Sequence, residues 1–182
     1  MRKTIAAINM TLDGVCDHTA VAADDDIHEH YGNLIQNADT ILYGRITFEL
    51  MVFWKDLMEK PSGEKSMNEF AAAMDGIHKI VFSRTLKSTD WKSAKLAERS
   101  LEDEVLALKQ QKGRDILVGS RSLIVQLMNL GLLDELQLTI HPIVAGHGSL
   151  LFNQTLNRKD LKLTDTKIFG SGAITLYYML KK

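Results

Sequence analysis

Three short segments each combine a small residue, an arginine and a hydroxyl residue directly after an apolar run. They are Gly44-Arg45-Ile46-Thr47, Ser83-Arg84-Thr85 and Gly119-Ser120-Arg121-Ser122. A glycine lets the backbone come close to a ligand, and an arginine supplies forked donors that are always charged. Because the N–H groups at a helix start also favour anions, three such segments predict a ligand with several phosphates, such as a dinucleotide.

Each segment also has an ordinary structural explanation. Glycine is common in the turns that follow strands, and Thr47 and Ser122 are helix-capping residue types. One segment alone is therefore better explained by turn and cap chemistry than by phosphate binding. The coincidence of three similar segments favours the binding interpretation, although no G-x-G-x-x-G fingerprint follows the first apolar run.

The spacing of apolar residues predicts the elements that must position these segments. A helix beginning near Asp24 carries Ile27, Tyr31, Leu34 and Ile35 on one face. Further helices are expected from Thr47, over 67–75, over 101–112 and over 122–130. Strands are expected at 4–9, 39–43, 78–83, 91–94, 115–118, 134–144, 161–169 and 173–180, with Pro142 indicating an edge or a bulge.

Helices alternate with strands early in the chain, and strands dominate late. This order predicts an α/β fold with three layers. Its sheet is mixed and mainly parallel, with about eight strands, helices on both faces and a C-terminal antiparallel hairpin. A length of 182 residues without repeats or a convincing linker predicts a single domain over 1–182. In such sheets ligands bind beyond the carboxyl ends of the strands, where the three segments are expected.

Composition excludes several classes of function. The formal charge of -1 leaves no basic excess for nucleic-acid binding. Cys16 is the only cysteine, which excludes an intramolecular disulfide and the zinc-deaminase signature. His28 and His30 would face different directions on a helix, so we expect no metal site. Without a signal-peptide stretch or a membrane-spanning apolar run, we expect a cytoplasmic protein without a membrane partner.

The segments 5–14, 41–49, 81–85, 116–123 and 131–152 occur in an order that resembles the dihydrofolate-reductase-like superfamily. The closest branch is that of the riboflavin-biosynthesis reductase, the C-terminal domain of the deaminase-reductase. The likeness covers nearly the whole chain. Its most specific part is the last segment, which contains D-E-L, H-P, G-x-G and L-F in order.

The resemblance implies an NADPH-dependent reductase, similar to the 5-amino-6-ribosylaminouracil-phosphate reductase. It would transfer a hydride to a small pterin- or pyrimidine-like heterocycle or to a carbonyl substrate, and it would form a homodimer. The implied cofactor-binding residues lie in four groups. Ala6 to Ile8 would line the nicotinamide, and the phosphates would be bound by Gly44, Arg45 and Thr47. The adenosine 2′-phosphate would be bound by Ser83, Arg84 and Thr85. The pyrophosphate would be bound by Gly119, Ser120, Arg121, Ser122 and Leu123.

The substrate side is less well defined. Asp13 would face the substrate, and a carboxyl beside an apolar strand could have a raised pKa and deliver a proton; the alternative is an ordinary turn residue before Gly14. For the helical acid of the folate enzyme, Asp26, His28 and Glu29 all fall near the required place.

Two positions depart from the family pattern. Ser120 replaces the second glycine of a usual Gly-Gly pair, and Val118 replaces an acidic residue that contacts the substrate. The main alternative function is a non-catalytic protein that binds NADPH or another nucleotide, and a purely structural or interaction protein is a third possibility.

Overall fold

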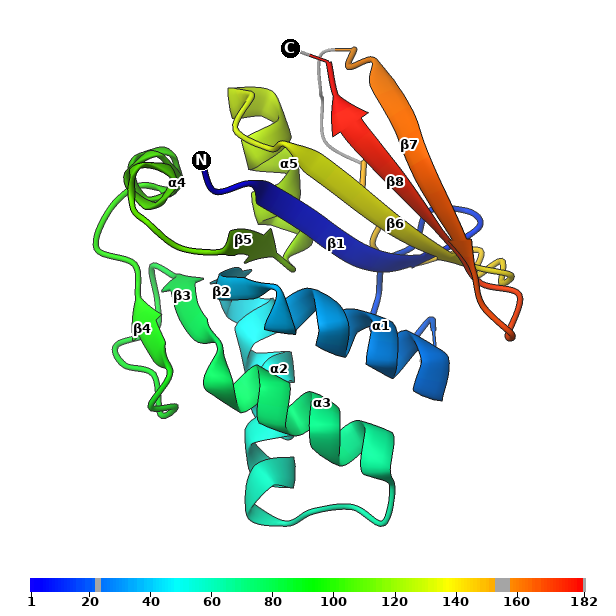
Figure 1. Cartoon of the computed structure of the whole chain (residues 1–182), viewed down its shortest axis with the longest axis horizontal. Helices are drawn as coiled ribbons and strands as arrows, with labels where there is room; N and C mark the ends of the chain where they lie inside the picture. The colour runs from blue at the N-terminus through cyan, green and yellow to red at the C-terminus, as the bar shows by residue number, and fades with distance from the viewer. Residues whose placement is uncertain (22–23, 153–157, 182) are drawn as a thin grey trace.

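A computed structural model describes residues 1–21, 24–152 and 158–181, which form one mixed sheet between two layers of helices (Figure 1). The strands are β1 (Thr4–Thr11), β2 (Ala38–Gly44), β3 (His78–Phe82), β4 (Ala94–Leu96), β5 (Asp115–Val118), β6 (Glu135–His141), β7 (Leu161–Ile168) and β8 (Ile174–Leu180). The helices are α1 (Asp25–Gln36), α2 (Arg45–Glu59), α3 (Lys65–Gly76), α4 (Leu101–Gln110) and α5 (Arg121–Leu130).

The eight strands follow the order β4-β3-β2-β5-β1-β6-β8-β7. All neighbours from β4 to β6 pair in parallel, whereas β8 pairs antiparallel with both β6 and β7. The predicted mainly parallel sheet with a C-terminal hairpin is thus confirmed. Since β3, β2 and β5 are consecutive and parallel, the three segments that follow them lie at one edge of the sheet.

Helices α1, α2 and α3 cover one face of the sheet and α4 and α5 cover the other (Figure 1). The sheet therefore separates two apolar cores. Successive strand residues point to opposite faces. In β1, Ile5 joins the core under α1–α3, and Ala6 joins the core under α4 and α5. In β5, Leu117 and Val118 divide in the same way. No helix in the described ranges has the length and apolar character needed to cross a membrane.

Three predicted boundaries are wrong. Helix α2 begins at Arg45 rather than Thr47, because Gly44 already has the extended backbone of an N-cap. The short strand is 94–96 rather than 91–94, and Trp91 is instead buried, with its indole N–H donating to Asp75 at 2.6 Å. Pro142 marks neither an edge nor a bulge of β6, because this inner strand ends at His141.

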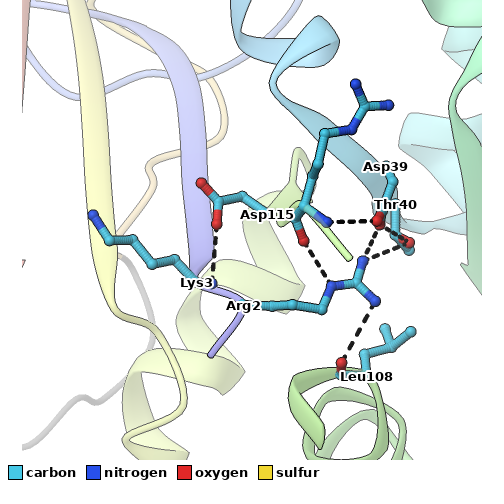
Figure 2. Close-up of polar contacts among 7 residues, drawn as sticks. Arg2, Lys3, Asp39, Thr40, Leu108 and Asp115 are labelled. Carbon is cyan, nitrogen blue, oxygen red and sulfur yellow. Dashed lines mark hydrogen bonds and ion pairs between the residues drawn. The ribbon is translucent and has the colours of Figure 1, made fainter. Parts of the chain in front are cut away.

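A polar cluster ties together the amino ends of β1, β2 and β5 (Figure 2). The buried guanidinium of Arg2 donates to the Asp39 carboxylate, to the Thr40 hydroxyl at 3.1 Å and to the Arg114 carbonyl at 2.7 Å. The backbone N–H of Lys3 donates to the Asp115 carboxylate at 3.1 Å. The charged cluster therefore fixes the amino-terminal edge of the sheet. The three segments lie at the opposite edge, beyond the carboxyl ends of the strands.

Candidate functional site

The three segments converge on a cavity of about 600 Å³ at the carboxyl ends of β2, β3 and β5. Residues predicted to bind the cofactor make up most of its wall: Gly44, Arg45, Thr47, Ser83, Arg84, Ser120, Ser122 and Leu123. Sequence reasoning missed Arg99 and Ser100, which reach the same cavity from the segment before α4. Among the described residues, its wall contains three arginines and no acidic side chain, so the cavity is suited to an anion.

Two helices begin at this cavity without a side-chain cap. The N-terminus of α1 is capped by Asp24 and that of α4 by Ser100, whereas no side chain caps α2 or α5. Helix α3 also lacks a side-chain cap, but its first residues line neither of the two cavities described here. The first-turn N–H groups of α2 and α5 are therefore available to an anionic ligand.

Ser120 links the two helix starts instead of capping its own helix. Its hydroxyl oxygen accepts a hydrogen bond from the Gly44 N–H at 2.8 Å, and the residue is only 2% exposed. A glycine at this position, as in the family pattern, could not make this bond. The serine therefore couples the turn after β5 to the turn after β2.

The arginines at the site differ in their present partners. Arg45 donates to Glu49 one helical turn later, at 2.9 Å, in a half-exposed pair. Such a surface pair contributes little, so a phosphate could replace the carboxylate as the partner of Arg45. Arg84 is exposed, and Arg99 lies 4.0 Å from Glu104. Arg121 lies outside this cavity and donates instead to the Leu150 carbonyl at 2.9 Å.

The hydroxyl of Ser83 is already engaged within its own loop. Its oxygen accepts from the backbone N–H groups of Thr85, at 3.1 Å, and Leu86, at 2.9 Å. Thr85 lines neither cavity in the described part of the chain. The loop after β3 is therefore shaped by Ser83, and within the segment Arg84 is the side chain best placed to meet a ligand.

A second, larger cavity of about 650 Å³ adjoins the first. Ile46, Thr47 and Ser122 line both cavities, so the two meet at the starts of α2 and α5. The larger cavity is bounded by β1 through Ala7, Ile8 and Asn9, and by apolar side chains of α1, α2 and α3. Ala6 is completely buried in the core on the other face of the sheet and does not line it.

Of the three residues considered for the helical acid, His28 alone lines the larger cavity. Asp26 and Glu29 are exposed on another face of α1. The sequence did contain a signal for this choice, because His28 has the helical spacing i, i+3, i+7 with Tyr31 and Ile35. Desolvation by burial lowers the pKa of His28, which favours the neutral imidazole.

Asp13 does not have the raised pKa expected from the sequence. Its carboxylate accepts hydrogen bonds from the Thr11 hydroxyl and from the backbone N–H groups of Ala145, at 3.1 Å, and Gly146, at 2.7 Å. These bonds, led by that from Thr11, lower its pKa to about 2, because they stabilise the charged form of an exposed group. Within the described ranges, Asp13 lines neither cavity and holds the loop after β6.

The remaining histidines of interest have separate surroundings. His30 is buried against Tyr31 and Phe169, with ring centroids 5.3 Å and 5.4 Å away, and burial lowers its pKa to about 4. His141 is buried at the end of β6, with Nε2 3.0 Å from the Asn9 side-chain oxygen. Among residues 1–21, 24–152 and 158–181, no three metal-ligating side chains are grouped as a metal site requires.

Comparisons with known proteins bear on the family and on the fold of the chain. A family model described as the RibD C-terminal domain matches residues 2–175. The chain is 35% identical over 181 residues to the uncharacterized protein YyaP of Bacillus subtilis (strain 168), with 97% of this chain and 94% of that protein covered. A putative riboflavin biosynthesis protein from Shewanella sp. PV-4 superposes with a TM-score of 0.75 at 16% identity, covering 99% of each chain.

A dihydrofolate reductase from Enterococcus faecalis, complexed with NADP(H) and RAB-propyl, superposes with a TM-score of 0.66 at 14% identity. That superposition covers 99% of this chain and 97% of the reductase. At such low identities the two solved structures are evidence for the fold alone. They confirm the dihydrofolate-reductase-like architecture predicted from the sequence.

Proposed function

The chain belongs to the RibD C-terminal domain family, and on that premise we propose that it is an NADPH-dependent reductase of a small heterocyclic or carbonyl substrate. One observation carries the proposal: an arginine-lined cavity at two uncapped helix starts opens beside an apolar cavity of similar size. A dinucleotide needs anion-binding groups for its phosphates, and hydride transfer needs a site that excludes water.

The smaller cavity supports the assignment of the nucleotide end. The first-turn N–H groups of α2 and α5, together with Arg45, would bind the phosphates. Phe82, Ala97 and Leu101 offer apolar surface for a flat base. Arg84 and Arg99 approach the same cavity from β3 and from the segment before α4, so either could bind a 2′-phosphate and distinguish NADPH from NADH.

The larger cavity would hold the reacting groups. Bound NADPH supplies the hydride, and the protein supplies position and electrostatics. Ala7 and Ile8 of β1 present a smooth, largely apolar wall against which a flat ring could be oriented. Tyr43, Met74 and Leu117 extend this apolar lining and would keep water away from the reacting atoms.

Titration with NADPH tests the proposal directly. At 100 times Kd, a ligand that binds only the folded state should stabilise it by about 2.7 kcal/mol, which differential scanning calorimetry can measure. Arg45→Ala combined with Arg84→Ala should weaken NADPH binding without unfolding the protein. If millimolar NADPH changes neither melting temperature nor fluorescence, the proposal is wrong.

A non-catalytic NADPH-binding protein is the second candidate, favoured by one observation. Among the described residues, Asp13 lines neither cavity, and the hydrogen bonds that hold its carboxylate lower its pKa, so it is not placed to serve as a proton donor. This candidate predicts tight NADPH binding with no loss of NADPH absorbance on a panel of pterins, pyrimidines, ketones and quinones. Reduction of any one of these compounds with saturation kinetics would show that the protein is an enzyme and would exclude the non-catalytic candidate.

We also propose that the protein acts as a homodimer. Strand β7 is an edge strand, and large apolar side chains are exposed on it and on β8, including Leu163, Ile168 and Met179. Exposed edges and apolar surface of this kind favour cover by a partner. Light scattering after size-exclusion chromatography should give twice the mass of the chain, and Ile168→Lys should reduce it to that of a monomer.

A further inference from the structure

Three ring side chains from three different helices form one wall of the larger cavity. His28 of α1, Trp54 of α2 and Phe70 of α3 constitute this aromatic wall. The Trp54 and Phe70 rings are 4.6 Å apart between centroids, and the His28 ring lies 5.7 Å from Trp54 and 5.8 Å from Phe70. The two contacts of Trp54 are edge-to-face and the His28–Phe70 contact is tilted, and together they hold the imidazole in place against flat apolar surfaces.

Four other polar side chains of the cavity, those of Tyr31, Tyr43, Asp17 and Arg121, have protein partners. The Tyr31 hydroxyl donates to Thr139 at 3.1 Å, and the Tyr43 hydroxyl contacts the Met74 sulfur at 3.8 Å. The Asp17 carboxylate accepts from Thr19 within its own turn. Arg121 is likewise bonded to a backbone carbonyl. Within the aromatic wall His28 is the polar member, and its ring has no hydrogen-bond partner among the described residues.

The surroundings of the imidazole define which nitrogen carries its proton. Nδ1 of His28 is buried and has no hydrogen-bond partner among the described residues. A buried N–H without an acceptor is rarer and costlier than an unpaired acceptor. Because desolvation also lowers the pKa of the ring, we assign the neutral tautomer with the proton on Nε2. In this form His28 is a hydrogen-bond donor.

We propose that the larger cavity binds a flat, uncharged ring that carries a carbonyl oxygen, and that His28 recognises this oxygen by donating a hydrogen bond from Nε2. The inference rests on the proposed reductase function, since it names the class of substrate for the same site. A phosphate would lose its hydration beside Trp54 and Phe70, where the neutral imidazole of His28 offers it no compensating charge.

Two ligands that differ by the carbonyl group alone test this inference. 1-Tetralone has the oxygen, and tetralin has the same two fused rings without it. Isothermal titration calorimetry on the full chain, in the presence of NADP⁺ so that no turnover occurs, would measure both affinities. We expect the wild-type protein to bind 1-tetralone about tenfold more tightly than tetralin, the size of effect that one well-placed hydrogen bond can produce.

Variants at His28 then separate recognition from packing. His28→Phe keeps a flat ring but removes the donor, so it should bind 1-tetralone about tenfold more weakly and tetralin unchanged. His28→Gln keeps an N–H donor and should recover part of the preference for the ketone. Unchanged tetralin affinity also demonstrates that the cavity of each variant is intact. An equal loss of affinity for both ligands would mean that His28 only shapes the cavity, and it would overturn the inference.

The wild-type protein is sufficient to refute the inference even if a variant fails to fold. Equal affinity for 1-tetralone and tetralin would exclude recognition of the carbonyl oxygen. NADPH titration of the same preparation keeps the two proposals distinct. If NADPH binds while the ketone preference is absent, the substrate inference is wrong and the reductase proposal stands. If the ketone preference holds while NADPH does not bind, the reductase proposal fails and the carbonyl subsite stands.

Discussion

The Ser120 hydroxyl oxygen accepts a hydrogen bond from the backbone N–H of Gly44 at 2.8 Å. This bond connects the residue that precedes α5 to the residue that precedes α2, so the two uncapped helix starts have a fixed spacing. Under the proposed function, two helix starts whose separation is fixed in advance would bind a pyrophosphate at a lower entropic cost than two independent turns. The serine that departs from the family's glycine pair thus has a positioning role.

Ser120→Ala should weaken both stability and cofactor binding. The substitution leaves the Gly44 N–H without its partner in a largely buried turn, which costs about 1–3 kcal/mol of unfolding free energy. Urea denaturation would measure this loss, and Ser88→Ala, at an exposed serine, is the control. NADPH affinity should fall in Ser120→Ala alone. Unchanged affinity would mean that the bond does not position the phosphate site.

Arg84→Ala should weaken NADPH binding about tenfold or more and leave NADH binding nearly unchanged, because a charge-assisted hydrogen bond to the 2′-phosphate would be lost. Arg99→Ala, at the other arginine of this wall, tests which of the two makes the contact. Arg158→Ala, which removes an exposed arginine paired with Asp160, is the matched control. An unaltered ratio of NADPH to NADH affinity in both variants would refute the 2′-phosphate assignment.

The sequence sufficed to bring the three segments together at one cavity because their features are local. A strand end, a turn and a helix start are contiguous in Gly44-Arg45-Ile46-Thr47, and parallel pairing brings such units together at one edge. Arg99 was missed because it follows no such pattern and reaches the cavity through the path of the chain before α4. Arg121 was placed with the phosphates by its position in the motif, but its side chain extends to Leu150.

The substrate side depends on packing between distant elements. The helical spacing of His28 with Tyr31 and Ile35 places it on the apolar face of α1, but the packing of α1 against α3 is what brings that face to the cavity. The pKa of Asp13 was predicted in the wrong direction for a related reason. The N–H groups that stabilise its carboxylate belong to Ala145 and Gly146, far along the chain.

Asp13→Asn should destabilise the protein at neutral pH, and the difference from wild type should vanish in acid. Hydrogen bonds lower the pKa of the folded state from 3.8 to about 2, so the charged carboxylate stabilises the fold above pH 3.8. That contribution is lost as the pH falls from 3.8 to about 2. Urea midpoints of both proteins at several pH values would measure it. A difference that stays constant across this range would contradict the assigned role.

His30→Phe should make the fold less sensitive to mild acid. Burial lowers the pKa of His30 from 6.5 to about 4, so between these values the unfolded chain binds the proton that the folded protein excludes. Wild-type stability should therefore decline from pH 6.5 to about pH 4, and His30→Phe should decline less. Thermal melts over this range would measure the slopes, with the exposed His147→Gln as the control. Parallel slopes in wild type and His30→Phe would refute the prediction.

Gly119→Ala should destabilise the protein through a clash with Tyr43. A Cβ at residue 119 would lie 2.8 Å from Cε1 of Tyr43, whose ring is 3% exposed and packed in the core. Overpacking of this kind typically costs about 1–3 kcal/mol, and a displaced start of α5 should also weaken NADPH binding. Gly63→Ala is the matched control, because an added Cβ there meets nothing within 4 Å.

Tyr43→Leu supplies the second test. In the Tyr43→Leu background, Gly119→Ala should lower the unfolding free energy clearly less, since the ring that the added Cβ would contact is gone. Equal costs of Gly119→Ala in both backgrounds, measured by urea denaturation, would show that the glycine is required for a reason other than its contact with Tyr43.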